Sequence, residues 1–218
     1  MNDKDKTFST DDERTLNIKD FAGRRPRMLG ERLFKKYAVL VPLVDTPDGT
    51  AILFERRSDK LRRQPGEICF PGGKIGSDET PQDCAVRETA DELCIQERQI
   101  RIYGPGDTFV SPFNLIIYPF IGFLKDYRFT CNPEEVSEVI AVPLEFFMQH
   151  NPEKYKSTVI SKLPGDFPYE RIPGGENYPW ATGTHDILFY QYDNLLIWGI
   201  TALVVQSAAE LIGRYNLG

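Results

Sequence analysis

Histidine and cysteine are scarce in this sequence, and the few present do not suggest a metal or nucleophile site. The 218 residues include 2 histidines and 4 cysteines. His150 and His185 are isolated, and neither has a partner that suggests a Ser/His/Asp triad. The cysteines are Cys69, Cys84, Cys94 and Cys131. They lack the spacing of zinc ligands and of a disulfide framework, so we expect reduced thiols in a cytoplasmic protein.

The sequence also lacks a net positive charge and a long apolar run. The formal net charge is -6, with 26 basic and 32 acidic residues. This balance argues against broad nucleic-acid binding, which depends on many phosphate contacts. No apolar run is long enough to span a membrane, and we find no secretory signal. We therefore expect neither nucleic acid nor membrane as a partner, and either a monomer or a homodimer.

What the chain does have is enough apolar residues for one ordinary domain. The hydrophobic content is 41%, and no internal repeat or low-complexity linker interrupts it. The first residues are polar and charged. We predict an N-terminal arm with a short helix over residues 1–34 and a single domain over residues 35–218.

Short strand patterns are interspersed with two main helix patterns. Residues 37–44 and 51–57 are typical of two strands around a turn. The other expected elements are a motif helix beginning near residue 80, strands over 99–104 and 115–124, a short helix over 143–150, an antiparallel pair over 155–160 and 185–192, and a closing helix over 197–215. Residues 162–185, rich in Pro, Gly and aromatics, are expected to be a long loop. The pattern predicts an α/β fold with a sheet between helices.

The segment Phe70–Ile95 combines a tight Pro-Gly-Gly turn with an acidic helix. Thr80 is a good N-cap, Pro81 suits the first helical position, and Asp83 stands where a capping box places its acid. The helix is therefore predicted to begin directly after Thr80.

Three carboxylates are expected on one face of this helix. Glu88, Asp91 and Glu92 are neighbours because residues three and four apart share a helix face, and Arg87 can pair with Asp91. On periodicity alone, a solvated charged face is the simpler explanation. A hard divalent cation, which prefers oxygen ligands, would instead turn the repulsion into binding energy. The Gly73 turn can bring a backbone carbonyl to the same point.

The spacing of these residues resembles the signature of the Nudix hydrolases. That pattern is G-x5-E-x7-R-E-U-x-E-E-x-G-U, where U is a bulky apolar residue. The matching residues are Gly73, Glu79, Arg87, Glu88, Glu92 and Ile95. Thr89, Asp91 and Cys94 depart from it, in place of an apolar residue, Glu and Gly.

An upstream segment resembles the extension found in the coenzyme A pyrophosphatase branch of that family. The branch pattern is L-L-T-x-R-S/A-x3-R-x3-G-x3-F-P-G-G. The matching residues are Leu53, Arg57, Ser58, Arg62, Gly66 and Phe70–Gly73, whereas Phe54 and Glu55 replace the second Leu and the Thr. Residues 132–144 and 197–202 also resemble segments of this branch. The resemblance thus extends over roughly residues 37 to 212.

The resemblance implies a Nudix-type α/β/α sandwich with a mixed sheet, and hydrolysis of coenzyme A to 3′,5′-ADP and 4′-phosphopantetheine. The implied cofactor is Mg²⁺ or Mn²⁺ and the implied partner is a small-molecule nucleotide. The implied metal ligands are Gly73, Glu88, Asp91 and Glu92. The implied catalytic residues are Glu88, Glu92, Arg87 and Glu135, with Glu134 and Glu138 as alternatives to Glu135. The implied substrate contacts are Arg57, Arg62, Phe70 and Gly72, since an arginine fork suits phosphate oxygens.

Two other functions stay open from the sequence. The first is a Nudix hydrolase that acts on ADP-ribose, a dinucleotide or a nucleoside triphosphate. The second is a degenerate Nudix domain that binds a nucleotide without turnover, for which Thr89, Asp91 and Cys94 are the supporting features. Glu88 and Glu92 are both present, which favours the enzyme.

Overall fold

The computed structural model describes residues 18 and 21–217. The chain divides into two compact units, Met1–Phe34 and Lys35–Gly218, which we describe separately. The first unit contains a 3-10 helix, η1 (Glu31–Leu33). The predicted N-terminal arm falls largely on residues 1–17 and 19–20, outside the described residues, so the division into an arm and one domain remains a prediction.

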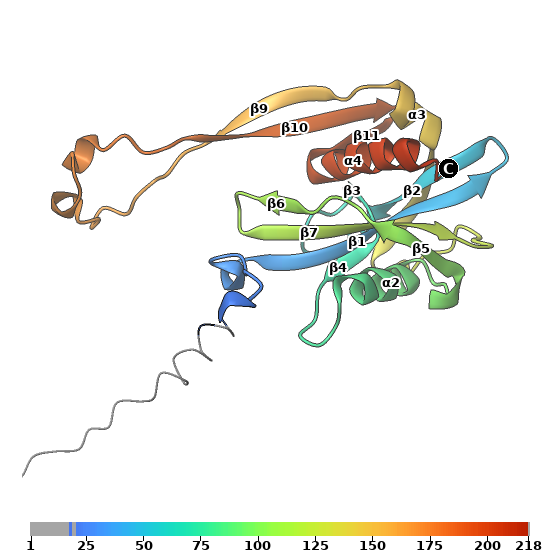
Figure 1. Ribbon diagram of the computed structural model, residues 1–218. Coiled ribbons are helices and arrows are strands. Elements are labelled where there is room, and N and C mark those ends of the chain that lie inside the picture. Colours follow the sequence, from blue (N-terminus) through green and yellow to red (C-terminus); the bar gives the residue numbers. More distant parts are fainter. Residues whose placement is uncertain (1–17, 19–20, 218) are drawn as a thin grey trace, which may run out of the picture. The chain divides into compact units, whose positions relative to one another are not determined.

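The second unit is built on a mixed sheet (Figure 1). Its centre is β1 (Lys35–Thr46), which runs antiparallel to β2 (Gly49–Arg57) and parallel to β7 (Leu115–Leu124). The remaining strands are β3 (Ile68–Cys69), β4 (Gly72–Lys74), β5 (Ile100–Pro105), β6 (Phe109–Ser111) and β8 (Val136–Pro143). A 3-10 helix, η2 (Glu97–Gln99), precedes β5.

Two helices cover the two faces of this sheet, α2 (Pro81–Glu92) and α4 (Gly199–Tyr215) (Figure 1). Successive side chains of a strand point to opposite faces. Accordingly, Leu53 of β2 lies in a core with Ala85 of α2, whereas Phe54 lies in a core with Val205 of α4. The expected α/β fold, with a mixed sheet between helices, is confirmed.

The last part of the chain forms a second, three-stranded antiparallel sheet. It follows α3 (Leu144–Gln149) and contains β9 (Glu153–Val159), β10 (Gly183–Tyr192) and β11 (Leu195–Trp198). The predicted late antiparallel pair is thus β9 and β10. The closing helix was predicted to begin at residue 197, but Ile197 and Trp198 end β11, and α4 begins at Gly199.

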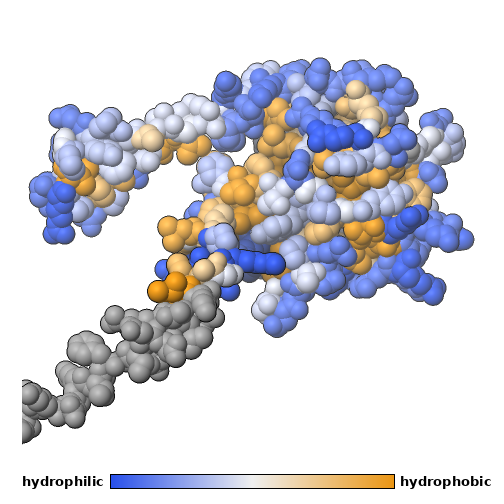
Figure 2. Space-filling model, in the orientation of Figure 1, coloured by the Kyte–Doolittle hydropathy of each residue, from blue (hydrophilic) through white to orange (hydrophobic). Residues whose placement is uncertain are grey.

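A long hairpin joins β9 to β10 (Figure 1). Its connection holds two 3-10 turns, η3 (Tyr169–Arg171) and η4 (Gly175–Asn177), in the predicted loop. Phe167 and Trp180 meet there edge to face. Figure 2 shows apolar side chains on the hairpin as well as on the visible face of the domain. In the part of the chain that the structure describes, no helix is both long and apolar enough to cross a membrane.

Candidate active site

The tight turn before α2 is held against the end of that helix by a single hydrogen bond. The backbone amide of Gly72 donates to Oε2 of Glu92 over 2.8 Å. Gly72 has φ of 150°, and a Cβ there would lie 2.3 Å from the carbonyl oxygen of Ala38. Only glycine accepts both the conformation and the close approach, so this residue fixes where Glu92 is held.

The next glycine makes room for the second glutamate. A Cβ on Gly73 would lie 2.3 Å from Cδ and Oε1 of Glu88. Gly73 is held in β4 by pairing with Ala38 of β1, and its carbonyl accepts a 3.6 Å contact from Sγ of Cys84. The turn backbone therefore touches Glu88 and Glu92, which are four residues apart on α2.

Arg87 joins two further carboxylates. Its guanidinium donates to Oε1 of Glu79 over 2.9 Å and pairs with Oε1 of Glu88 over 2.9 Å. Hydrogen bonding from Arg87, with help from the Gly76 amide, lowers the pKa of Glu79 to about 2. The expected Arg87–Asp91 pair does not form in the structure, because the guanidinium is already engaged by these two glutamates.

Glu92 and Glu55 form a buried carboxyl pair. Glu92 on α2 is 7% exposed and Glu55 on β2 is 1% exposed. Burial, together with the charges of Glu55, Glu88 and Glu135, raises the pKa of Glu92 to about 9. Burial likewise raises the pKa of Glu55 to about 7. A carboxyl group removed from water resists ionisation unless an opposite charge compensates.

Glu135 lies near the buried Glu55–Glu92 pair. The side chain of Asp91, by contrast, points into solvent. The charge of Glu135 acts on both Glu55 and Glu92. Its segment is held in place because the Ser58 amide donates to the Glu135 carbonyl over 2.8 Å. Asp91 is exposed and makes no ion pair with another described residue. The structure thus brings Glu55 and Glu135 to the site and leaves Asp91 at its edge.

The alternatives to Glu135 have ion-pair partners of their own. Glu134 pairs with Lys60 over 2.6 Å. Glu138 pairs with Arg56 over 2.9 Å. Glu135 is the one of the three that acts on the buried pair, which favours it among these candidates.

The other two departures from the motif are accommodated locally. Thr89 is fully buried, and its hydroxyl donates to the Ala85 carbonyl over 2.7 Å, so the polar atom has a partner. Cys94 has φ of 53° directly after α2, and the Ile95 amide donates to the Ala90 carbonyl over 3.0 Å. This is the left-handed helix end where the family has glycine.

The upstream residues implied as substrate contacts are in different settings. Arg57 is half-buried, donates to the Arg63 carbonyl over 3.2 Å, and acts electrostatically on Glu55. Arg62 is exposed, with no hydrogen bond or ion pair to another described residue. Phe70 is 5% exposed and stacks on Phe54 at 4.8 Å between ring centroids. Its ring therefore anchors the turn in the core.

Sequence reasoning did not identify Glu55 as a site residue. In the sequence, Glu55 stands out only as a replacement for the threonine of the branch pattern. The available signal was alternation along β2: Leu53 faces the α2 side of the sheet, so Glu55 must face it too. An acid at an inward position of a buried strand requires an explanation.

The donors at this site suit a hard divalent cation. Among the described residues, no three His, Cys, Asp or Glu side chains already form a metal-binding group. The groups gathered here are nevertheless oxygen donors, from Glu88, Glu92 and the Gly73 carbonyl, as Mg²⁺ and Mn²⁺ prefer. In addition, the buried Oε2 of Glu55 has no hydrogen-bond partner. The residues present fit the implied cation.

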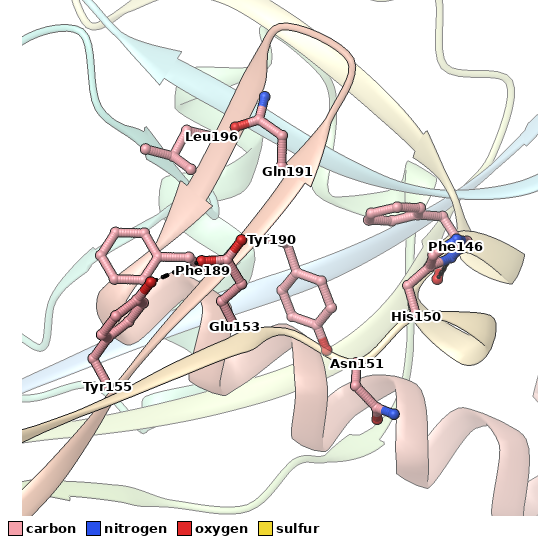
Figure 3. A pocket seen from close by; sticks show the side chains of 9 residues that line it. All are labelled: Phe146, His150, Asn151, Glu153, Tyr155, Phe189, Tyr190, Gln191 and Leu196. Atoms are coloured by element: carbon pink, nitrogen blue, oxygen red, sulfur yellow. Dashed lines mark hydrogen bonds between the residues drawn. The ribbon is translucent and has the colours of Figure 1, made fainter.

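A cavity of about 500 Å³ lies elsewhere, against the second sheet (Figure 3). Phe146 of α3 and Phe189 and Tyr190 of β10 contribute aromatic walls, and Tyr155 donates to Glu153 over 3.0 Å. Its lining residues all come from residues 146–196, so it is separate from the turn and α2.

Comparison with known proteins decides the family. The NUDIX domain model matches residues 34–162. This chain belongs to the Nudix family. The motif built around Gly73, Arg87 and Glu92 is accordingly the Nudix motif.

Individual Nudix relatives indicate to which branch of the family the chain is most similar. Mouse peroxisomal coenzyme A diphosphatase NUDT7 is 36% identical over 137 residues, which cover 61% of this chain and 56% of that protein. The match thus spans little more than half of the mouse protein. Nudix hydrolase 3 of Caenorhabditis elegans is 25% identical over 199 residues, covering 88% of this chain and 79% of that protein. The first relative supports the coenzyme A pyrophosphatase branch.

Two further comparisons carry less weight. The uncharacterized Nudix hydrolase NudL of Yersinia enterocolitica is 29% identical, covering 80% of each chain. The crystal structure of RenU, a Nudix hydrolase from M. smegmatis, aligns with a TM-score of 0.45 at 21% identity, over 53% of this chain and 74% of that one.

The mouse relative is named as peroxisomal, whereas the thiols predict a cytoplasmic protein, so the compartment remains a prediction.

Proposed function

We propose that this Nudix protein hydrolyses the pyrophosphate bond of coenzyme A or its derivatives, giving 3′,5′-ADP and 4′-phosphopantetheine or its acyl form. The observation that carries the proposal is the position of the branch-specific arginine segment. Arg57 lies at the end of β2, close enough to Glu55 to act on its charge, and Glu55 adjoins Glu92 of the motif helix. An arginine side chain of the type that suits phosphate oxygens therefore lies beside the carboxylate site, which supports the proposal. The mouse diphosphatase supports the same substrate.

The chemistry follows from the carboxylate site. A divalent cation would neutralise the charge of the pyrophosphate and favour attack by water. Glu88, Glu92 and the Gly73 carbonyl would hold it, with Asp91 as a further candidate ligand from the family motif. In this arrangement the Gly72 amide fixes the orientation of the Glu92 carboxylate.

The remaining residues position the reacting groups. Arg87 holds Glu88 from one side and Glu79 from the other, so it orients the carboxylate rather than contacting the substrate. One of Glu88, Glu92 and Glu135 would accept a proton as water attacks phosphorus and the bridging P–O bond breaks. Among these, Glu135 is the exposed carboxylate, free of the turn and of Arg87, which favours it as the base.

Substrate choice is the test of this proposal. The kcat/KM values for coenzyme A, ADP-ribose, a dinucleotide and a nucleoside triphosphate should be compared with Mg²⁺ and with Mn²⁺. We expect coenzyme A to give the highest value by at least tenfold. A higher value for ADP-ribose or a dinucleotide would support the other Nudix activity, and binding of coenzyme A without turnover would support a degenerate domain.

A further inference from the structure

We propose that Glu55 of β2 is an additional carboxylate of the cation site, placed opposite Glu92 of the motif helix. This inference rests on the cation site of the proposed function, but it does not depend on which substrate is hydrolysed. Glu55 lies outside the Nudix signature and replaces the threonine of the branch pattern. It therefore adds a carboxylate that neither pattern includes.

The first observation is an unpartnered buried oxygen. Glu55 is 1% exposed, and its Oε2 has no hydrogen-bond partner. Its other oxygen, Oε1, receives a 3.6 Å contact from Sγ of Cys69. Buried polar atoms in folded proteins nearly always have a partner, so an isolated carboxylate oxygen requires a compensating group.

The second observation is the position of this oxygen. The carboxyl groups of Glu55 and Glu92 are neighbours, and the charge of Glu55 acts on Glu92. Two ionised carboxylates can only accept, so they cannot bond directly to each other and instead repel. A divalent cation between them would satisfy both, since several carboxylates can coordinate one such ion. The same cation would lie near Glu88 and Glu135, whose charges reach Glu92.

The fold explains why this residue reaches the site. β2 lies between β1 and β8, and the β2–β8 ladder pairs Glu55 with Val139. Side-chain alternation along β2 turns Glu55 to the face that α2 covers, under the last turn of that helix. Among the described residues, the cation that acts on Glu55 is Arg57, and its guanidinium already donates to the Arg63 carbonyl. Arg87 pairs with Glu88, so Arg57 alone faces the carboxylates of Glu55, Glu92 and Glu135 and does not balance all three.

The alternative role is structural: Glu55 would merely keep a buried contact with Glu92 and Cys69. Metal binding separates the two roles without any substrate. Mn²⁺ affinity should be measured by titration calorimetry and by electron paramagnetic resonance on the wild type and on Glu55→Gln and Glu55→Thr. The second variant restores the residue of the branch pattern. Glu67→Gln is the matched control, since Glu67 precedes β3 and its carboxylate accepts from Gln64.

We expect Glu55→Gln and Glu55→Thr to weaken Mn²⁺ binding by at least tenfold, while Glu67→Gln stays within twofold of the wild type. The rise in Tm caused by saturating Mn²⁺ should shrink in both Glu55 variants. Wild-type affinity in both would overturn the inference, as would absence of Mn²⁺ binding by the wild type. Loss of the folded state in both variants without metal would assign Glu55 a structural role and also overturn it. Failure to hydrolyse coenzyme A, with Glu55-dependent Mn²⁺ binding, would overturn only the proposed function.

Discussion

Glu92 and Gly72 are joined by a 2.8 Å hydrogen bond from the glycine amide to the glutamate carboxylate. The bond connects the end of the motif helix to the turn that precedes it, and it fixes a buried carboxylate against that turn. In the same turn, a side chain on Gly73 would collide with the carboxylate of Glu88. Each glycine therefore positions one glutamate, and this explains why the glycine pair and the acidic helix occur together in the motif.

The first prediction separates the two acids at the end of α2. Glu92→Gln should lower kcat at least a hundredfold, because it removes a buried charge from the cation site. Asp91→Asn should lower it less than fivefold, because the Asp91 side chain is exposed whereas that of Glu92 is buried. Steady-state kinetics with coenzyme A, with circular dichroism to verify folding, measure both. Equal losses in the two variants would show that Asp91 is also a ligand.

The second prediction concerns the end of α2. Cys94 has φ of 53°, a conformation that costs a residue with a Cβ but not glycine. Cys94→Gly should therefore raise the free energy of unfolding by about 1 kcal/mol. Urea denaturation measures it, and Cys94→Ala, which keeps the Cβ, is the control and should give no comparable gain. Stabilisation by both substitutions would point to the thiol rather than to the backbone.

The third prediction is a pH dependence of stability. The pKa of Glu79 is lowered to about 2 by Arg87, from an ordinary value of 4.5. A lowered carboxyl pKa contributes stability above pH 4.5 that is lost as the pH falls toward 2. The Tm difference between wild type and Glu79→Gln should therefore be largest at pH 6 and shrink below pH 4.5.

A double-mutant cycle with Arg87→Gln isolates this pair. The coupling in Tm between positions 79 and 87 should be present at pH 6 and weaker at pH 3.5. A Tm difference that stays constant over this range would mean that the ion pair does not account for the effect of Glu79.

Much of the local structure can be predicted from the sequence, because its causes are local. Thr80 accepts from the Asp83 amide at 3.2 Å, as the capping pattern predicts. The strands β1, β2 and β7 follow their apolar patterns. Contacts between distant segments could not be predicted in the same way. The pairing of β2 with β8 brings together residues about 80 positions apart, and with the Ser58–Glu135 hydrogen bond it brings Glu135 near Glu55.

The sequence also could not predict which of several similar carboxylates an arginine pairs with. Arg87 is four residues from Asp91, yet it pairs with Glu79, eight residues away, because the turn folds back over the helix. The arginine segment shows the same limit. Arg56 and Arg57 would lie on opposite faces of a regular strand, but the β2–β8 register shifts between them, so simple alternation does not decide their orientation.

The fourth prediction concerns recognition of the 3′-phosphate. A charge-assisted contact contributes roughly 1.5–3 kcal/mol, or about one to two powers of ten in kcat/KM. The wild type should prefer coenzyme A over dephospho-coenzyme A by that factor. Arg62→Ala or Arg57→Ala should remove most of the preference and leave turnover of dephospho-coenzyme A nearly unchanged.

Arg56→Ala is the control, because Arg56 already pairs with Glu138. It should keep the wild-type preference. Equal use of the two substrates by the wild type would exclude a role for either arginine in binding the 3′-phosphate, while the pyrophosphatase activity itself would stand.

The most direct test of the account is product identification by mass spectrometry after incubation of the protein with coenzyme A. With Mg²⁺ or Mn²⁺ we predict equal amounts of 3′,5′-ADP and 4′-phosphopantetheine, and no product with excess chelator or with the folded Glu92→Gln variant. Full activity in chelator, or tight binding of coenzyme A with no metal-dependent product, would contradict the proposed enzyme.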